Sequence, residues 1–357
     1  MFAAGNSAAA TAANYIEDVF STYLYTGNST SQTITNGIDL SGQGGLTWIK
    51  KRNAAEDHVL TDTVRGAGNT LFSNLTDAND YDITRVSGFT SSGFSVGGSF
   101  RVNQSANTYA SWTFRKQPKF FDMVTWNGDG TSNRVISHSL ASTPGCLILK
   151  NTTSSTAWVV AHRALTGGLT DARLLLNTTA AETTGLAGAN IAGADSTTVT
   201  LGTVGVNQSG QSYVMYLFAH NAGGFGSSGT DNVISCGSYT TDGSGNASVT
   251  LGYEPQWLMT KISTTTGDWR IIDNMRQMSL TNNFFLYPNT SGAEVDNTFA
   301  TWQPNATGFT HNQANANQTF IYIAIRRGPM KTPTTGTSVY GQQLNQGNPT
   351  FDFPPDM

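Results

Sequence analysis

The stretch Gly45-Leu46-Thr47-Trp48-Ile49-Lys50 decides the fold, because two later stretches of the chain share its pattern. These are Gly145-Cys146-Leu147-Ile148-Leu149-Lys150 and Gln256-Trp257-Leu258-Met259-Thr260-Lys261, and each is an apolar run that ends in a lysine. A ring residue follows each lysine by eight positions, and a polar residue follows each ring by four. Recurrence at constant spacing indicates an internal threefold repeat. The recurring positions are Lys50, Lys150 and Lys261, then His58, Trp158 and Trp269, then Asp62, His162 and Asp273.

The similarity continues beyond these positions. The first and third copies have an arginine at the next matching place, Arg65 and Arg276, where the second copy has Leu165. Each copy then closes with a segment of alternating apolar residues, which is typical of a half-buried strand. These closing strands are expected at Tyr109 to Arg115, Tyr213 to Ala219 and Phe320 to Arg326.

A candidate hairpin lies ahead of each lysine run. Asn or Asp beside Gly supplies the positive φ angles that tight hairpin turns require. Such pairs occur at Gly27-Asn28, Asn127-Gly128 and Asp242-Gly243. Each copy would therefore hold two hairpin strands, the lysine strand, a strand after the ring residue, a Gly/Thr/Asn-rich middle and the closing strand. About a hundred residues with roughly six to eight short strands is typical of a small two-sheet sandwich.

The sequence thus predicts an all-β chain of three tandem β-sandwich, jelly-roll-like repeats, at residues 15–117, 118–222 and 223–328. Residues 1–14 are expected to be an N-terminal anchor, and the alanine-rich stretch from residue 7 to 20 favours a helix about as well as an extended segment. Residues 329–357 are expected to be an extended linker or the start of a truncated fourth repeat. The second alternative rests on the similarity of Phe353-Pro354-Pro355-Asp356-Met357 to Glu254-Pro255-Gln256-Trp257-Leu258.

Composition argues against several classes of function. Charged residues make up only 12% of the chain and its formal net charge is −4, so a surface that follows nucleic-acid phosphates has little support. No apolar stretch approaches the ~18 to 20 residues of a membrane span. Cys146 and Cys236 lack CxxC spacing, and we interpret both as buried small hydrophobic residues. We expect neither nucleic-acid binding nor membrane insertion.

No motif in the chain indicates catalysis, a cofactor or a metal. The five histidines lack metal-site spacing, and glycan hydrolysis would need two carboxylates converging across a cleft. Acids such as Asp62 and Asp273 instead fall at matching repeat positions, as structural residues would. The recurring lysines and rings fit two interpretations, a repeated ligand groove or packing of the lysine stem on the ring, and packing is the commoner use of such a pair. The sequence predicts a protein that is not an enzyme, with no cofactor, no metal and no catalytic residue.

Three stretches of the chain resemble a repeated domain of virion proteins from tailed phages of aquatic bacteria, often long proteins regarded as tail fibres. They run from Asp18 to Asn28, from Ser111 to Lys116 and from Tyr216 to Gly226, and the likeness covers nearly all of residues 15–330. It implies a virion component of the tail, made in the host cytoplasm and involved in host attachment. The resemblance supplies no catalytic residue to carry over.

The resemblance also implies partners. Such fibres are usually homotrimers, because an elongated spike gains stability by burying strand edges between chains. We expect a homotrimer whose N-terminal segment attaches to other tail proteins and whose distal repeats face host glycan or another receptor. Two other classes fit the same residues: a capsid decoration or tail accessory protein, and a polysaccharide-degrading tailspike.

Overall fold

The computed structural model describes residues 13–202, 205–278, 282–297, 299–312 and 315–331, and they form a mostly β fold of antiparallel sheets. Every strand pair between named strands is antiparallel, and the helices are single turns. These are η1 (Ile16–Asp18), α1 (Phe100–Asn103), α2 (Gly168–Asp171) and η2 (Asn274–Arg276). The all-β prediction is therefore confirmed.

The first segment of the chain, from β1 to β9, holds a large sheet and a small one. The large sheet has the order β1-β9-β3-β4-β5-β6 and the small sheet has the order β2-β8-β7. The strands are β1 (Phe20–Thr26), β2 (Gln32–Thr35), β3 (Gly45–Lys51), β4 (Val59–Asp62), β5 (Asn69–Phe72), β6 (Asp80–Tyr81), β7 (Val86–Thr90), β8 (Gly93–Val96) and β9 (Thr108–Arg115).

The second segment, from β10 to β17, has the large sheet β10-β17-β12-β13-β14 and the small sheet β11-β16-β15. The first strand, the closing strand, the strand that ends in the lysine and the strand after the ring residue lie side by side in the order β10-β17-β12-β13, which matches β1-β9-β3-β4 of the first segment. The strands are β10 (Phe121–Asn127), β11 (Val135–Ser137), β12 (Cys146–Asn151), β13 (Val159–His162), β14 (Leu174–Leu175), β15 (Ile191–Ala194), β16 (Thr198–Leu201) and β17 (Ser212–Phe218).

The third segment, from β18 to β26, has the large sheet β18-β26-β20-β21, the small sheet β19-β25-β24 and the separate pair β22-β23. The strands are β18 (Ile234–Thr240), β19 (Asn246–Thr250), β20 (Pro255–Ile262), β21 (Arg270–Asp273), β22 (Asn283–Phe285), β23 (Val295–Asn297), β24 (Thr301–Asn305), β25 (Gly308–Asn312) and β26 (Thr319–Arg326). The lysine strands and the strands after the ring residues lie where the sequence predicts them.

The expected hairpins do not form. The first strand of each segment pairs with the closing strand, and the second strand pairs in the small sheet, so the turn between them crosses from one sheet to the other. The closing strand displaces the hairpin partner because it offers a seven-residue register to the first strand, from Phe20 opposite Phe114 to Thr26 opposite Thr108.

The closing strands are also more deeply buried than expected. Ser111 and Thr113, on the polar face of β9, are both fully buried, as are Trp112 and Phe114 on the other face. The strand lies in the middle of the large sheet and is covered on both sides, so it is not half-buried. One face packs on the small sheet of its own segment, and the other faces the neighbouring segments.

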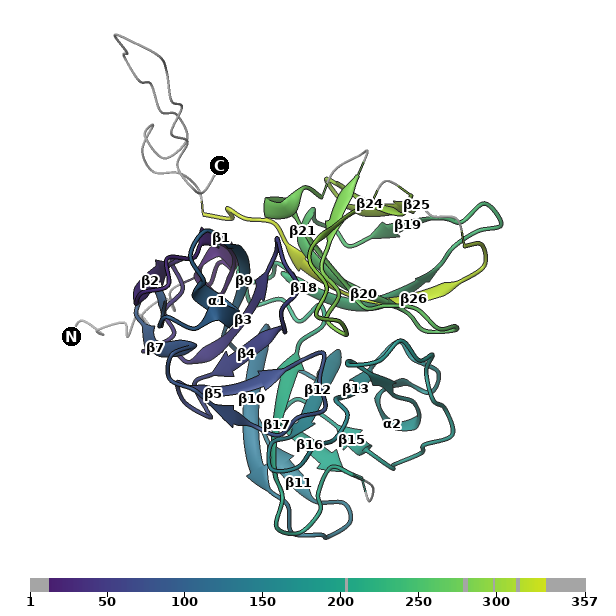
Figure 1. Ribbon diagram of the computed structural model, residues 1–357. Coiled ribbons are helices and arrows are strands. Elements are labelled where there is room, and N and C mark those ends of the chain that lie inside the picture. Colours follow the sequence, from purple (N-terminus) through teal and green to yellow (C-terminus); the bar gives the residue numbers. More distant parts are fainter. Residues whose placement is uncertain (1–12, 203–204, 279–281, 298, 313–314, 332–357) are drawn as a thin grey trace, which may run out of the picture.

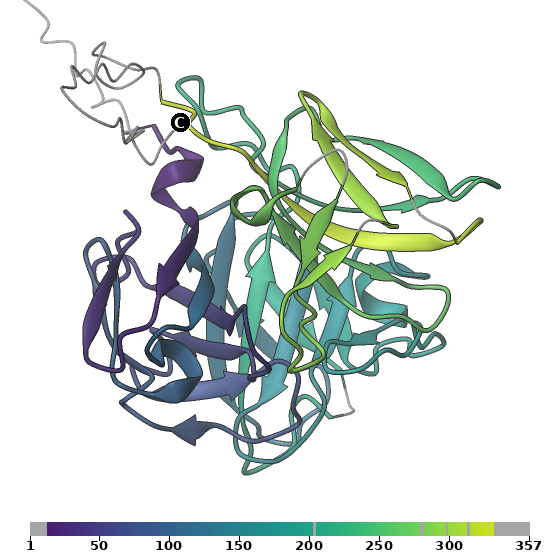
Figure 2. The ribbon, with the colours of Figure 1, turned by 45° about the horizontal axis from the view of Figure 1, so that its top comes forward.

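The three segments surround a common centre (Figure 1, Figure 2), where one hydrophobic cluster includes residues of all three. The Phe114 ring lies 5.7 Å from that of Phe218 and 5.6 Å from that of Trp257, measured between centroids. The two ends of the described chain meet, because the backbone N–H groups of Met330 and Lys331 donate to the Glu17 carboxylate at 3.1 and 2.9 Å. The segments thus form a closed ring rather than a row.

The predicted end segments lie mostly outside the described residues. Of the stretch from 7 to 20 that favoured a helix, the structure describes 13–20, which contains the single turn η1 and the start of β1. The anchor predicted at 1–14 and the linker or fourth repeat predicted at 329–357 lie largely outside the described residues. Cys146 and Cys236 are both buried and free, and burial raises the pKa of each thiol.

Candidate functional site

The nine recurring positions all lie at the junctions between segments. Each junction joins one segment to the segment before it in the closed ring. The lysine and the ring residue of the later segment face loops of the earlier one. The polar residue of the earlier segment faces the closing strand of the later one. The junctions are first/second, second/third and third/first, and the last of them closes the ring.

Each lysine is buried and donates its ammonium hydrogens to two backbone carbonyls. One carbonyl belongs to the residue that follows the lysine, and the other to the preceding segment in the ring. The cross-segment contacts are Lys50 Nζ to Ser291 O at 3.3 Å, Lys150 Nζ to Thr76 O at 3.0 Å and Lys261 Nζ to Thr179 O at 3.3 Å. Burial lowers the pKa of each of the three lysines to about 8.

The ring residues occupy matching places beside these lysines. Trp158 Nε1 donates to the Phe72 carbonyl and Trp269 Nε1 to the Leu175 carbonyl, both at 3.0 Å. His58 instead accepts at Nδ1 from Trp48 Nε1 of its own segment at 3.0 Å. Burial lowers the pKa of His58 well below its ordinary value, so the ring is neutral. Trp158 and Trp269 therefore hydrogen-bond across junctions, whereas the hydrogen bond of His58 lies within its own segment.

The third set of positions differs between junctions. Asp62 Oδ2 accepts from Tyr216 Oη at 2.7 Å, and Asp273 Oδ2 accepts from Trp112 Nε1 at 2.9 Å. His162 Nε2 lies 3.1 Å from the Tyr322 carbonyl. Because His162 Nδ1 accepts from the Ala164 N–H at 3.2 Å, the imidazole is neutral and carries its proton on Nε2.

The arginines complete the two junctions that have an aspartate. Arg65 Nε lies 2.7 Å from Asp62 Oδ2, and Arg276 Nε lies 2.8 Å from Asp273 Oδ2. Arg276 also pairs with Glu294 at 3.0 Å and places its guanidinium 5.2 Å from the centroid of the Trp112 ring. At the second/third junction Leu165 replaces the arginine and is buried.

The chain also contains a repeated element that is not among the positions predicted from the sequence. Val102-Asn103-Gln104-Ser105 and Val206-Asn207-Gln208-Ser209 are identical tetrapeptides. Asn103 Nδ2 donates to Asn28 Oδ1 at 3.1 Å and Asn207 Nδ2 to Asp129 Oδ1 at 2.7 Å, so each clamps the turn that links the two sheets. The available signal was the identity of the two tetrapeptides at a similar distance from the closing strands, since Asn103 lies twelve residues before the end of β9 and Asn207 eleven before the end of β17.

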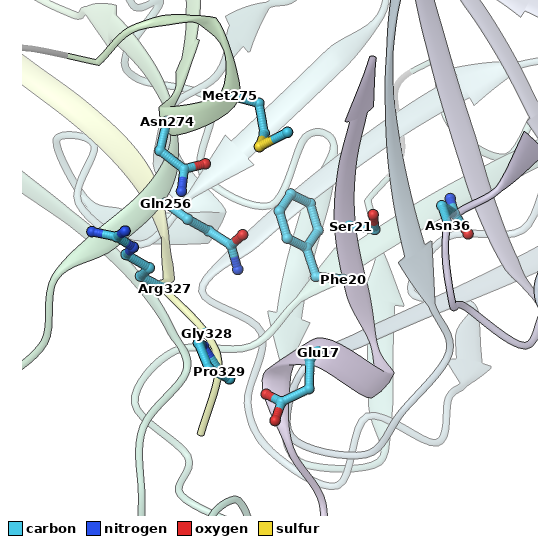
Figure 3. A pocket seen from close by; sticks show the side chains of 10 residues that line it. All are labelled: Glu17, Phe20, Ser21, Asn36, Gln256, Asn274, Met275, Arg327, Gly328 and Pro329. Atoms are coloured by element: carbon cyan, nitrogen blue, oxygen red, sulfur yellow. The ribbon is translucent and has the colours of Figure 1, made fainter. Parts of the chain in front are cut away.

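Cavities lie both at a junction and within a segment. One, of about 150 Å³, lies at the third/first junction, where Phe20, Gln256 and Met275 point toward one another (Figure 3). Its polar atoms are mostly engaged, since Gln256 donates to Arg326 O at 2.8 Å and Glu17 holds Met330 and Lys331. The other, of about 180 Å³, lies in the second segment beside β12, β13 and β14 of the large sheet, where Arg173, Asn190 and Gln208 also line it.

Chemically, the junctions offer bonds between segments rather than reactive groups. Within the described residues, no three His, Cys, Asp or Glu side chains come together as metal ligands would. No helix in this part of the chain is both long and apolar enough to cross a membrane. The recurring lysines, rings and acids are engaged by neighbouring segments, which supports the packing interpretation of these residues over a shared groove.

Comparison with known proteins gives one family. A family model described as "Domain of unknown function (DUF7483)" matches residues 16–329. No curated protein matches the chain.

Proposed function

We propose that this chain, which belongs to the DUF7483 family of domains of unknown function, is a non-catalytic structural protein of a tailed-phage virion, located in a tail fibre or appendage that contacts the host. The virion assignment is supported by the sequence resemblance of residues 15–330 to phage tail proteins. The structural role is supported by the junctions.

In this proposal the chain consists of three copies of one sandwich unit. The shared strand order of the three large sheets and of the three small sheets supports this. So does the packing of small on large sheets, as between Phe94 of β8 and Val59 of β4 in one cluster of the first segment, or Phe309 of β25 and Phe320 of β26 in one cluster of the third. The copies at residues 15–117, 118–222 and 223–328 stay a prediction.

One observation carries the structural role: the side chains at the recurring positions form contacts between the three segments of the same chain. Lys50 reaches residue 291 and Trp112 reaches residue 273, so contacts between distant parts of the sequence consume the side chains that a repeated active site would need. A protein whose repeated polar residues bind its own segments gains rigidity, which suits an assembly component.

The homotrimer also stays a prediction, but fewer surfaces of the chain are free to form it. The inward faces of the three closing strands are already covered within one chain. Three copies would therefore meet through outer surfaces, such as the outer edges of the small sheets at β2, β11 and β19. Light scattering of the purified chain, whose mass is 38.0 kDa, measures the number of copies.

The decisive experiment locates the chain in intact particles of the phage that encodes it. Separated tails and capsids are analysed by mass spectrometry, and the particle is reconstructed by cryo-electron microscopy. We expect the chain in the tail fraction, in density with three lobes around a centre. Recovery on the capsid lattice would contradict the tail assignment in favour of a decoration protein. New reducing ends released from host polysaccharide by the purified chain would contradict the non-catalytic role.

A further inference from the structure

The cavity in the second segment lies at a place that the other two segments fill. Its floor is a row of apolar residues on neighbouring strands, Leu149 opposite Val159 and Val159 opposite Leu175. In the first segment the same row has Ile49, Val59 and Phe72. Val59 and Ile49 are fully buried there, whereas Val159 and Leu175 are partly exposed toward the cavity.

Arginines occupy this region in all three segments, but their surroundings differ. In the first segment, Arg85 and Arg101 lie 5.1 and 4.9 Å from the centroid of the Phe72 ring. Arg85 pairs with Asp80 at 2.5 Å and Arg101 with Glu56 at 2.7 Å. These guanidinium groups fill the space and are neutralised.

The third segment fills the place with aromatic rings. Arg270 lies 5.9 Å from the centroid of the Phe285 ring and 5.6 Å from that of the Trp302 ring. Both rings are fully buried.

Arg173 of the second segment has neither kind of partner. Within the described residues no carboxylate lies within 4.0 Å of its guanidinium, and no aromatic ring lies beneath it. Its Nη1 donates to Asn190 Oδ1 at 3.1 Å, while its buried Nε has no acceptor. Lys150 also lines the cavity, but its ammonium is engaged by Asn151 O and Thr76 O. The guanidinium of Arg173 is the cation that the cavity offers to a ligand.

A guanidinium with an open N–H edge recognises a carboxylate through paired hydrogen bonds. The cavity volume of about 180 Å³ is close to the roughly 150 Å³ that accommodates a six-membered benzene ring. An apolar floor with a few converging polar groups is the usual composition of a small-ligand site. Gln208 and Tyr213 also line the cavity and contribute polar groups to it.

We propose that this cavity binds one acidic pyranose, a hexuronic acid residue, with the sugar ring on the Leu149–Val159–Leu175 floor and its carboxylate on Arg173. The host surface polysaccharide as the source of that sugar rests on the proposed function. The binding chemistry does not, because it follows from the cavity alone.

The test is a titration of the full chain with sodium glucuronate, followed by ligand-observed NMR and calorimetry. We expect binding with a Kd on the order of 1 mM, as befits one small polar ligand, and at least tenfold weaker binding of glucose. Inorganic sulfate is the third arm. Sulfate binding as tight as that of glucuronate would overturn the acidic-sugar assignment, and absence of glucuronate binding would overturn the site.

Two variants locate the binding. Arg173→Gln removes the cation and is expected to weaken glucuronate binding at least tenfold. Leu175→Phe places the residue of the first segment, Phe72, into the second, and is expected to abolish binding while leaving the melting temperature unchanged or higher. Arg327→Gln, a matched control beside the other cavity, should bind as the wild-type chain does. Wild-type affinity in both cavity variants would overturn the proposal, whereas the location of the chain in the particle tests only its proposed function.

Discussion

The first/second and third/first junctions are each held by a buried aspartate and arginine, and the second/third junction by a neutral histidine beside a leucine. The difference follows the closing strand that each polar residue faces. Tyr216 and Trp112 donate a hydrogen bond to Asp62 and Asp273. The matching position of β26 is Ile323, which has no donor to offer.

This comparison teaches that the residues at a junction depend on one another. A buried carboxylate needs both a cation and further donors, so the loss of the donor at Ile323 accompanies the loss of aspartate and arginine together. His162 instead forms its hydrogen bonds with two backbone groups, the Tyr322 carbonyl and the Ala164 N–H. The segments can therefore share a fold while their junctions use different chemistry.

The largest effect is expected from breaking a charged junction. Asp273→Ala leaves Arg276, which is 0% exposed at its side chain, beside Glu294 alone. Removing one partner of a buried ion pair costs about 3–5 kcal/mol of unfolding free energy, measured by urea denaturation. The matched control is Glu254→Ala, which removes the exposed pair with Arg327 and should cost under about 1 kcal/mol. Equal effects of the two variants would show that the charged junction adds no special stability.

The second prediction replaces the histidine of the second/third junction by the aspartate that the other two junctions have. His162→Asp places a carboxyl opposite Ile323 without a cation, and we expect a loss of about 2–3 kcal/mol at pH 7 because the buried acid must either ionise unpaired or take up a proton. Adding Leu165→Arg should restore part of the loss, with a coupling of about 1–2 kcal/mol in the double-mutant cycle. Strictly additive effects would break the inferred dependence between these two positions.

The sequence contained enough information for the local elements but not for the junctions. Alternating apolar residues located β9 and the other closing strands, and the recurring apolar run that ends in a lysine located β3 and its counterparts, because both are local properties of a strand. The cross-segment partner of Lys50, Ser291, lies 241 residues away along the chain, so this contact depends on how the segments close into a ring. The hairpins failed for the same reason, since turn residues specify a turn but not which strand pairs beyond it.

Part of the junction chemistry was nevertheless visible in the residues. Leu165 stands where the other two copies have Arg65 and Arg276. At the same junction, His162 stands where the others have aspartate, and Ile323 stands where the others have tryptophan or tyrosine. These three coordinated changes, two in the second segment and one in the third, indicate positions that touch at one junction. The cavity beside Arg173 could not be predicted, because it arises from the shorter Leu175 where the first segment has Phe72.

The third prediction uses acid to test the histidine of the second/third junction. Burial lowers the pKa of His162 from 6.5 to about 3. Between these values the unfolded chain binds a proton that the folded chain does not, so the unfolding free energy falls as the pH falls from 6.5 toward 3. His162→Gln should make this fall shallower by up to about 1 kcal/mol per pH unit, measured by denaturation at pH 7, 6, 5 and 4. An unchanged slope would show that His162 is not the group that limits stability in acid.

The smallest effect is expected from a recurring lysine, where hydrogen bonds and the cost of burying an ammonium oppose each other. Lys150→Met keeps the apolar stem but removes the donors to Asn151 O and Thr76 O, and the net change at pH 7 should stay within about 1 kcal/mol. Because burial lowers the pKa of Lys150 from 10.5 to about 8, the unfolded chain binds the extra proton between these values, so this lysine makes the wild-type chain more stable as the pH rises from 8 toward 10.5. The variant should lose that part of the rise, whereas Lys331→Met, at an exposed lysine, should retain it. If Lys150→Met keeps the full wild-type rise between pH 8 and 10, the ammonium is not paying a burial cost at the first/second junction, and the recurrence of lysine would need a reason other than the paired carbonyls.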